Sequence, residues 1–258
     1  MDTVKKKKRS PLQATKRRLP GQSLEEEITK RRYDMLSDIL FPITLMFVVT
    51  SMEWYRWFSN TPPSPRLLTV LFVILCIWGF FRIRTARRQV EFLKLGRDGE
   101  REVADELDSL KTVGCSVFHD LQGKDWNIDH LVIGPTGVFS IETKTRSKLV
   151  GANEKIHYDG VRLLKGKVDA SEVLTQARAQ ANEIRELFGT YSEVRAPIQP
   201  VVLFPGWFVD ARTEAQGEVW VLNPKAFSKW VQGKKRILSE QDCKTLTQVI
   251  DVYTRHME

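Results

Sequence analysis

The stretch that decides the fold is residues 127–144, which read NIDHLVIGPTGVFSIETK. Two runs rich in β-branched residues flank a Gly-Pro-Thr-Gly turn, and this pattern predicts a β-hairpin. One strand carries Asp129, and the other carries Glu142 and Lys144. Because side chains alternate along a strand, Glu142 and Lys144 should emerge on the same face of the sheet.

The turn determines whether the two acids converge. A two-residue turn would pair Gly134 with Gly137 and set Asp129 opposite Glu142. Pro135 has a fixed negative φ, so a type I turn with Gly137 as a left-handed bulge also fits and would shift the register by one residue. We expect convergence, because the alternative leaves three charges on strands that otherwise favour burial.

Two carboxylates and an ammonium group on one sheet surface suit a hard divalent cation and a phosphate. The hairpin therefore predicts the reaction centre of a metal-dependent nuclease. The structural alternative for the same three side chains is a cross-strand salt bridge.

Length, cysteine content and charge narrow the kinds of protein that this chain can be. The 258 residues have room for one substantial domain and an accessory segment. Three widely spaced cysteines argue against a disulfide framework and fit a reducing compartment. The net charge is +8, and 11 basic residues lie in the segments 5–9, 16–18 and 30–32. Residues 1–37 are thus expected to form a basic cytoplasmic tail, either solvated or attracted to anionic lipid or nucleic acid.

Two apolar segments follow the tail, at residues 39–58 and 67–83, with a proline-rich turn between them. The second covers roughly 25 Å at about 1.5 Å per residue, close to a bilayer core of about 30 Å. We therefore predict a two-helix transmembrane hairpin over residues 38–84 that contacts membrane lipid through residues 39–83. The alternatives are a re-entrant or interfacial hairpin, which Pro42 would allow, and a buried helix pair in a soluble protein.

The basic residues around the apolar segments predict the orientation. Arg82, Arg84, Arg87 and Arg88 follow the second segment, whereas the connecting turn holds only Arg66. The positive-inside rule then places both termini in the cytoplasm. The expected location is the cell (inner) membrane, multi-pass, with the domain that follows on the cytoplasmic side.

From about residue 89 the pattern becomes mixed α/β. Hydrophobic periodicity predicts helices at residues 90–113, 170–188, 224–231 and 239–255, the first interrupted near its start by Gly96 and Gly99. It predicts strands at 115–121, 200–204 and 218–222, and a short hairpin at 157–164. The order indicates a layered sheet with helices packed against it. We assign residues 89–212 to the main domain, and residues 213–258 to a C-terminal strand and helices that pack on it.

Four motifs of this region resemble the nuclease-related domain (NERD) family. They are GRDGEREV at 96–103, VFHDL at 117–121, NIDHLVIGPTGVF at 127–139 and IETK at 141–144. The resemblance covers residues 95–212. It implies the restriction-endonuclease-like α/β fold, a mixed sheet flanked by helices, with the PD-(D/E)xK site of that superfamily.

The resemblance also implies roles for individual residues. Asp129 and Glu142 would ligate Mg²⁺ or Mn²⁺, with the Thr143 carbonyl as a third ligand. Lys144 would orient or deprotonate the attacking water and offset charge on the phosphate. Glu100 on the first helix matches an acid directed at the metal, and Gln176 matches a glutamine that orders the site.

The chain departs from the family pattern at two places. The Asn-Pro that often precedes the glutamine is replaced by residues EVLT at 172–175, and Ile128 stands where the superfamily name has proline. Glu100 could instead be a solvated residue near a helix N-terminus, and Gln176 a surface glutamine. His130 should point to the opposite face and be packed there.

Together these features predict a membrane-anchored, cytoplasm-facing nuclease-like protein that hydrolyses nucleic acid, with DNA favoured over RNA. All three central residues are present, which favours an enzyme. The rivals are a non-catalytic nucleic-acid-binding or scaffolding module with the same fold, and a membrane assembly or signalling factor that relies on the tail and the hairpin.

Overall fold

The computed structural model describes residues 17–62, 65–145, 155–166, 168–211 and 217–257. They form two compact units. The helical unit holds Gly21–Arg101 with Thr145, and the sheet unit holds residues 17–20, 102–144 and the described residues from 155 onward. The basic residues 5–9 and 16, and the predicted domain boundary at 212–213, lie outside the described residues.

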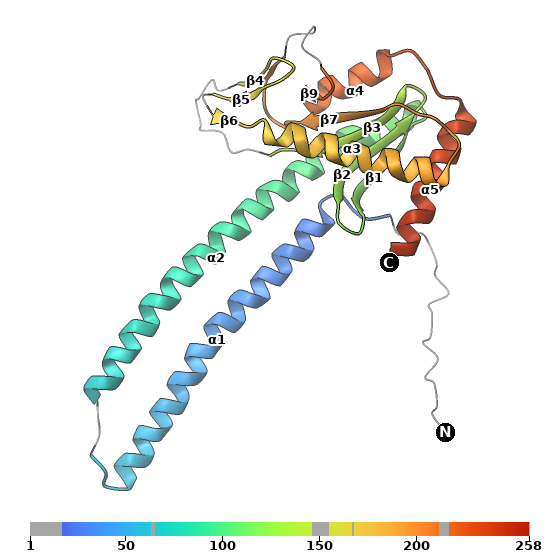
Figure 1. The fold of residues 1–258 in the computed structure, drawn as a ribbon. Coiled ribbons are helices and arrows are strands. Elements are labelled where there is room, and N and C mark those ends of the chain that lie inside the picture. Colours follow the sequence, from blue (N-terminus) through green and yellow to red (C-terminus); the bar gives the residue numbers. More distant parts are fainter. Residues whose placement is uncertain (1–16, 63–64, 146–154, 167, 212–216, 258) are drawn as a thin grey trace, which may run out of the picture. The chain divides into compact units, whose positions relative to one another are not determined.

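The sheet unit is built on five strands in the order β1-β2-β3-β7-β9 (Figure 1). These are β1 (Ser116–Gln122), β2 (Asn127–Gly134), β3 (Gly137–Thr143), β7 (Ile198–Leu203) and β9 (Trp220–Leu222). The first three form an antiparallel meander, and β3, β7 and β9 run parallel. The predicted hairpin is confirmed, as are the strands predicted on either side of it. Nearly every residue of β2 and β3 is buried, because helices cover both faces of the sheet.

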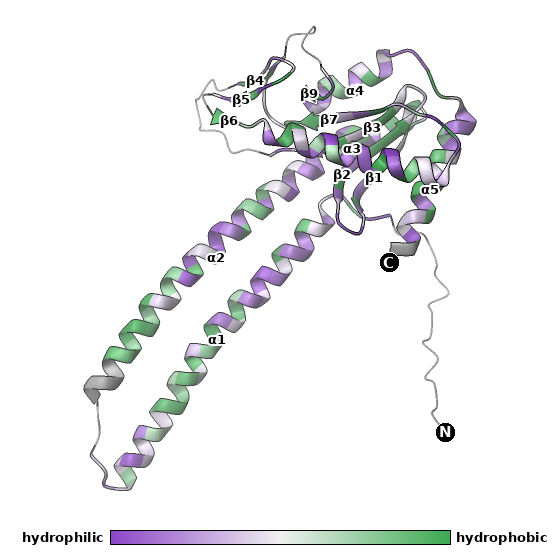
Figure 2. Ribbon diagram, viewed as in Figure 1, coloured by the Kyte–Doolittle hydropathy of each residue, from purple (hydrophilic) through white to green (hydrophobic). Residues whose placement is uncertain are grey.

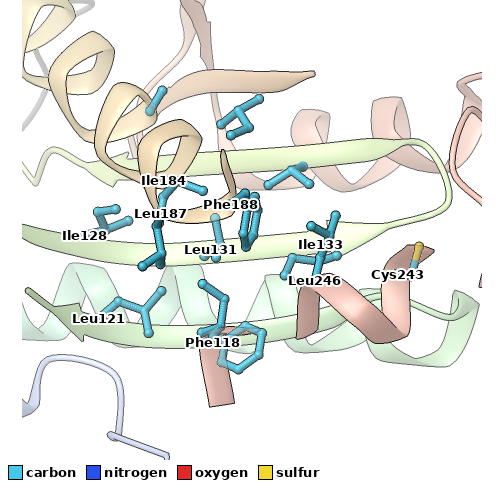
Figure 3. Packing of buried hydrophobic residues seen from close by; sticks show 14 of the residues in the cluster. Phe118, Leu121, Ile128, Leu131, Ile133, Ile184, Leu187, Phe188, Cys243 and Leu246 are labelled. Atoms are coloured by element: carbon cyan, nitrogen blue, oxygen red, sulfur yellow. The ribbon is translucent and has the colours of Figure 1, made fainter. Parts of the chain in front are cut away.

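One face of the sheet is covered by α3 (Glu172–Tyr191) and α5 (Glu240–Met257). In Figure 3, Ile184, Leu187 and Phe188 of α3 and Leu246 of α5 pack against apolar side chains of β1 and β2. The opposite face is covered by α4 (Pro224–Gly233), η1 (Ser109–Val113) and the end of α2, through a second buried cluster. The predicted mixed α/β fold with flanking helices is therefore confirmed.

A smaller sheet has the order β6-β5-β4-β8. It comprises β4 (Ile156–Tyr158), β5 (Leu163–Lys165), β6 (Val168–Asp169) and β8 (Val209–Ala211). The antiparallel β4–β5 pair confirms the hairpin predicted at 157–164. The pattern did not predict β6 and β8, because strands of two or three residues are too short to display alternation.

The helical unit consists of α1 (Gln22–Phe58) and most of α2 (Pro65–Asp108). The two helices lie antiparallel, joined by ion pairs from Arg97 to Glu25 and from Arg82 to Asp38, each at 2.7 Å. Figure 2 shows that the halves next to the connecting loop are hydrophobic and the opposite halves hydrophilic. α1 runs through Pro42 without a break.

The continuity of α2 corrects the prediction of a separate helix from residue 90. No proline or capping signal interrupts residues 66–108, and a helix tolerates an isolated glycine at a cost of about 1 kcal/mol. The two glycines do not interrupt the helix but allow other side chains to pack closely against it. A Cβ on Gly99 would lie 1.8 Å from Thr145 Oγ1, and one on Gly96 would lie 3.2 Å from Leu24 Cδ1.

Among the described residues, α1 is the one helix whose length and composition would let it cross a membrane. An 18-residue window in it has a mean hydropathy of 1.8, and none of that window is buried within the protein. The second predicted segment, 67–83, forms part of α2, and the side chains of residues 67–69 lie outside the described set.

Part of the basic tail is bound to the sheet unit. Arg17 makes two hydrogen bonds of 3.1 Å to Asp251 of α5 and lies 4.3 Å from the centre of the Phe118 ring. Arg18 pairs at 2.6 Å with Asp120, which is 1% exposed. These two residues of the tail therefore have partners within the sheet unit, which the charge pattern alone did not predict.

Candidate functional site

The hairpin register brings the two predicted acids together. Gly134 pairs with Gly137, and the same register runs through His130 and Ile141. One step further along, Asp129 of β2 lies across from Glu142 of β3. Gly137 has a φ of 134°, which glycine adopts readily, and it causes no shift of register. A slip of one residue would turn the side chains of one strand to the opposite face and separate Glu142 from Asp129.

Both acids are buried and held by hydrogen bonds. Asp129 is 8% exposed and Glu142 is 3% exposed. The Thr143 main-chain N–H donates to Asp129 Oδ2 at 2.7 Å. This bond ties the first acid directly to the strand that carries the second. The main-chain N–H of Lys144 donates to the Leu203 carbonyl at 2.9 Å, so β7 supports the end of β3.

Lys144 reaches back to the acid on its own strand. Its Nζ lies 2.5 Å from Glu142 Oε1 and donates to Gln176 Oε1 at 3.1 Å. The Lys144 side chain is 27% exposed, so the cation lies at the rim of the site while the carboxylates lie deeper. The ion pair joins Glu142 of β3 to the residue that directly follows this strand.

The structure adds Gln180, a residue to which the sequence analysis gave no role. Its Nε2 donates to Glu142 Oε2 at 2.5 Å and to the Asn127 carbonyl at 2.9 Å. It is 5% exposed, among the apolar side chains of α3. The sequence signal that could have identified Gln180 is its position inside the apolar stripe of a helix. A polar side chain at such a position is buried and needs hydrogen-bond partners in the interior.

The remaining predicted residues fall in different places. Gln176 is exposed on α3 and contacts Lys144. Glu100 is 8% exposed and lies far from the N-terminus of the long α2 helix, so it is not the solvated first-turn residue considered above. It belongs to the helical unit, whereas Asp129 and Glu142 belong to the sheet unit, and its role toward the metal stays a prediction.

The donor set fits a hard divalent cation. Asp129 and Glu142 offer carboxylate oxygens, and the Thr143 carbonyl follows directly on β3. Among the described residues, no group of three or more His, Cys, Asp or Glu side chains is placed to hold a metal. Two carboxylates suffice for Mg²⁺, which keeps several water ligands. Gln180 Oε1 is buried and has no hydrogen-bond partner among the described residues, so it is an acceptor for such a water.

His130 lies on the opposite face of β2, as the alternation predicts, and it is fully buried. Its Nδ1 lies 2.9 Å from Nδ1 of His119, whose Nε2 lies 3.0 Å from Asp108 Oδ1. Burial lowers the pKa of His130 well below its ordinary value and also lowers the pKa of His119. The pair is therefore neutral near pH 7 and belongs to the packing beneath the site.

Comparison with known proteins bears on the same region. No curated protein and no solved structure matches the chain. Residues 95–205, which span strands β1 to β7 and helix α3, match the family model described as the nuclease-related domain. This match supports the assignment of that part of the chain to the nuclease-related domain (NERD) family.

Proposed function

We propose that this protein is a membrane-anchored nuclease that hydrolyses phosphodiester bonds of nucleic acid with the help of Mg²⁺ or Mn²⁺. The observation that carries the proposal is the pair of buried carboxylates on adjacent strands, with a lysine at the rim. The match to the nuclease-related domain supports the same reaction class. DNA is the favoured substrate.

Each residue of the site has a part in this reaction. Asp129 and Glu142 would hold the cation, with the Thr143 carbonyl beside them. A divalent cation bound there would supply Lewis-acid activation of the phosphate and of the attacking water. Lys144, at the rim, is placed to contact the phosphate, to offset its developing charge and to orient or deprotonate the water. Gln176 would order the site through its bond to Lys144.

The direct test is cleavage by the full-length protein in detergent. We expect cleavage in Mg²⁺ or Mn²⁺ and none in a chelator, on a panel of duplex, single-stranded and branched substrates of DNA and RNA. A protein that binds these substrates but cleaves none of them would refute the proposal. It would favour a non-catalytic binding module, for which the Glu142–Lys144 ion pair would be structural.

The anchor is proposed to be the α1–α2 hairpin, with both termini and the sheet unit in the cytoplasm. The apolar halves of the two helices lie next to the connecting loop (Figure 2). Arg82, Arg84, Arg87 and Arg88 lie at the other side of the apolar stretch. This charge distribution supports a loop outside and a cytoplasmic domain inside.

Cysteine labelling tests this topology. In a variant without the native cysteines, Ser59→Cys should react with a membrane-impermeant maleimide in intact cells. Lys124→Cys, on the exposed loop between β1 and β2, is the matched control and should react only after lysis. Protection of Ser59→Cys in intact cells together with labelling after lysis would place the loop inside and contradict the spanning hairpin.

The basic tail is proposed to contact anionic lipid or nucleic acid independently of the metal site. Replacing Lys5–Lys8 with glutamine should weaken binding to anionic vesicles or duplex DNA. For DNA, the slope of the logarithm of the binding constant against the logarithm of the salt concentration should become shallower by about 0.9 for each lost phosphate contact. Arg17→Gln is the control expected to leave the slope unchanged, because Arg17 is already paired with Asp251. A parallel loss of metal affinity in the Lys5–Lys8 variant would contradict the separation of tail and site.

A further inference from the structure

Helix α3 presents two glutamines, Gln176 and Gln180, to the two members of the Glu142–Lys144 pair. Residues four apart lie on the same side of a helix, one turn from each other. Gln176 accepts from Lys144 at 3.1 Å, and Gln180 donates to Glu142 at 2.5 Å. One helix therefore contacts the acid and the base of the site separately.

The contacts of Gln180 determine the orientation of its amide. Its Nε2 faces two acceptors, Glu142 Oε2 and the Asn127 carbonyl, and an NH₂ group has two hydrogens to donate. Turning the amide over would direct Oε1 at both acceptors and leave three oxygens in mutual repulsion. Its Oε1 must therefore point away from them, where it is buried without a partner.

We propose that Gln180 is a positioning residue that sets the rotation of the Glu142 carboxylate for metal binding. This inference rests on the proposed function. The amide bridges Glu142 to the start of β2, the strand that also carries Asp129, so it fixes the second ligand relative to the first. A hydrogen bond to a charged carboxylate is stronger than one between neutral groups, and burial excludes competing water. The free Oε1 is available to a water ligand of the cation.

Glu186 is the control within the same helix. It is exposed on α3 and has no part in the proposed site. Loss of its side chain should leave the geometry of Glu142 intact. The two substitutions therefore separate a role in metal binding from a general effect of altering α3.

The experiment is a calorimetric Mn²⁺ titration of the full-length protein in detergent, with thermal unfolding measured in parallel. Gln180→Met, which keeps the length of the side chain but removes both hydrogen bonds, should weaken Mn²⁺ binding by about 10–100-fold, the usual effect of losing a partner of a metal ligand. Gln180→Asn keeps an amide that is too short to reach both acceptors, and it should show the same loss if the methionine variant fails to fold. Glu186→Met should change the affinity by less than about twofold, well below that range.

The outcomes separate this inference from the proposed function. Wild-type affinity for Mn²⁺ in folded Gln180 variants would overturn the role of Gln180 and leave the proposed function intact. Equal losses in the Glu186 and Gln180 variants would also overturn it, because they would indicate a general disturbance of α3. A wild-type protein that binds no Mn²⁺ would overturn both proposals.

Discussion

Replacement of Lys144 by alanine is expected to lower the rate of cleavage by about 10²–10⁴-fold, the usual effect of losing an acid–base group. Metal binding should survive, because both carboxylates remain. It could become tighter, since the ammonium that now lies 2.5 Å from Glu142 Oε1 would no longer compete for that oxygen. Single-turnover cleavage at saturating Mn²⁺, beside a calorimetric Mn²⁺ titration, measures the two effects separately.

Lys144→Arg distinguishes the two roles of the lysine. Arginine keeps the positive charge but does not deprotonate in proteins. If Lys144 deprotonates the water, the arginine variant should be as slow as the alanine variant. If it acts mainly by charge, arginine should retain much of the rate. Lys229→Ala, at an exposed position of α4, is the control expected to cleave normally. A Lys144→Ala variant with unchanged cleavage would place the chemistry elsewhere.

Asp129→Asn or Glu142→Gln is expected to abolish divalent-metal binding, and cleavage with it. Each change removes one of two negative charges from a site that binds its cation through carboxylate oxygens. In the wild type these acids are 8% and 3% exposed, so little bulk water is available to replace a lost ligand. Calorimetric titration with Mg²⁺ and Mn²⁺ measures the loss.

The control for the acids is Asp125→Asn, at an exposed position of the loop that precedes β2. It removes the same charge outside the site and should leave metal binding unchanged. Thermal unfolding must accompany the titrations, because the acids are buried. If Asp129→Asn, Glu142→Gln and Lys144→Ala all unfold the protein to the same extent, the three side chains form a structural salt-bridge network and the proposed metal site is wrong.

The hairpin was predictable because it depends on local rules, whereas the sequence left two registers open. In the structure Gly134 pairs with Gly137, which is the register that sets Asp129 across from Glu142. The helix at α3 was predictable for the same kind of reason, since its apolar residues recur at the helical period. Asp129, Glu142 and Lys144 could thus be placed on the hairpin before any tertiary contact was known.

Other features depend on contacts between residues far apart in the chain. The glycines at 96 and 99 were read as an interruption, yet they lie inside one long helix where Leu24 and Thr145 approach closely. Arg17 and Arg18 were counted with the basic tail, and the charge pattern gave no sign that they pair with Asp251 and Asp120. Glycine content and charge indicate only local preferences. They do not predict which side chains from distant parts of the sequence will lie close by.

By itself, the sequence determined the hairpin, the presence of two acids and a lysine on its strands, and the apolar segments before it, because alternation and periodicity are local properties. Only the tertiary structure decided that Gln180 bonds to Glu142 and Gln176 to Lys144. The two glutamines lie 38 and 32 residues along the chain from these partners. Their pairing follows from the packing of α3 on β3, which buries apolar surface and sets the helix position with no local signal in the sequence.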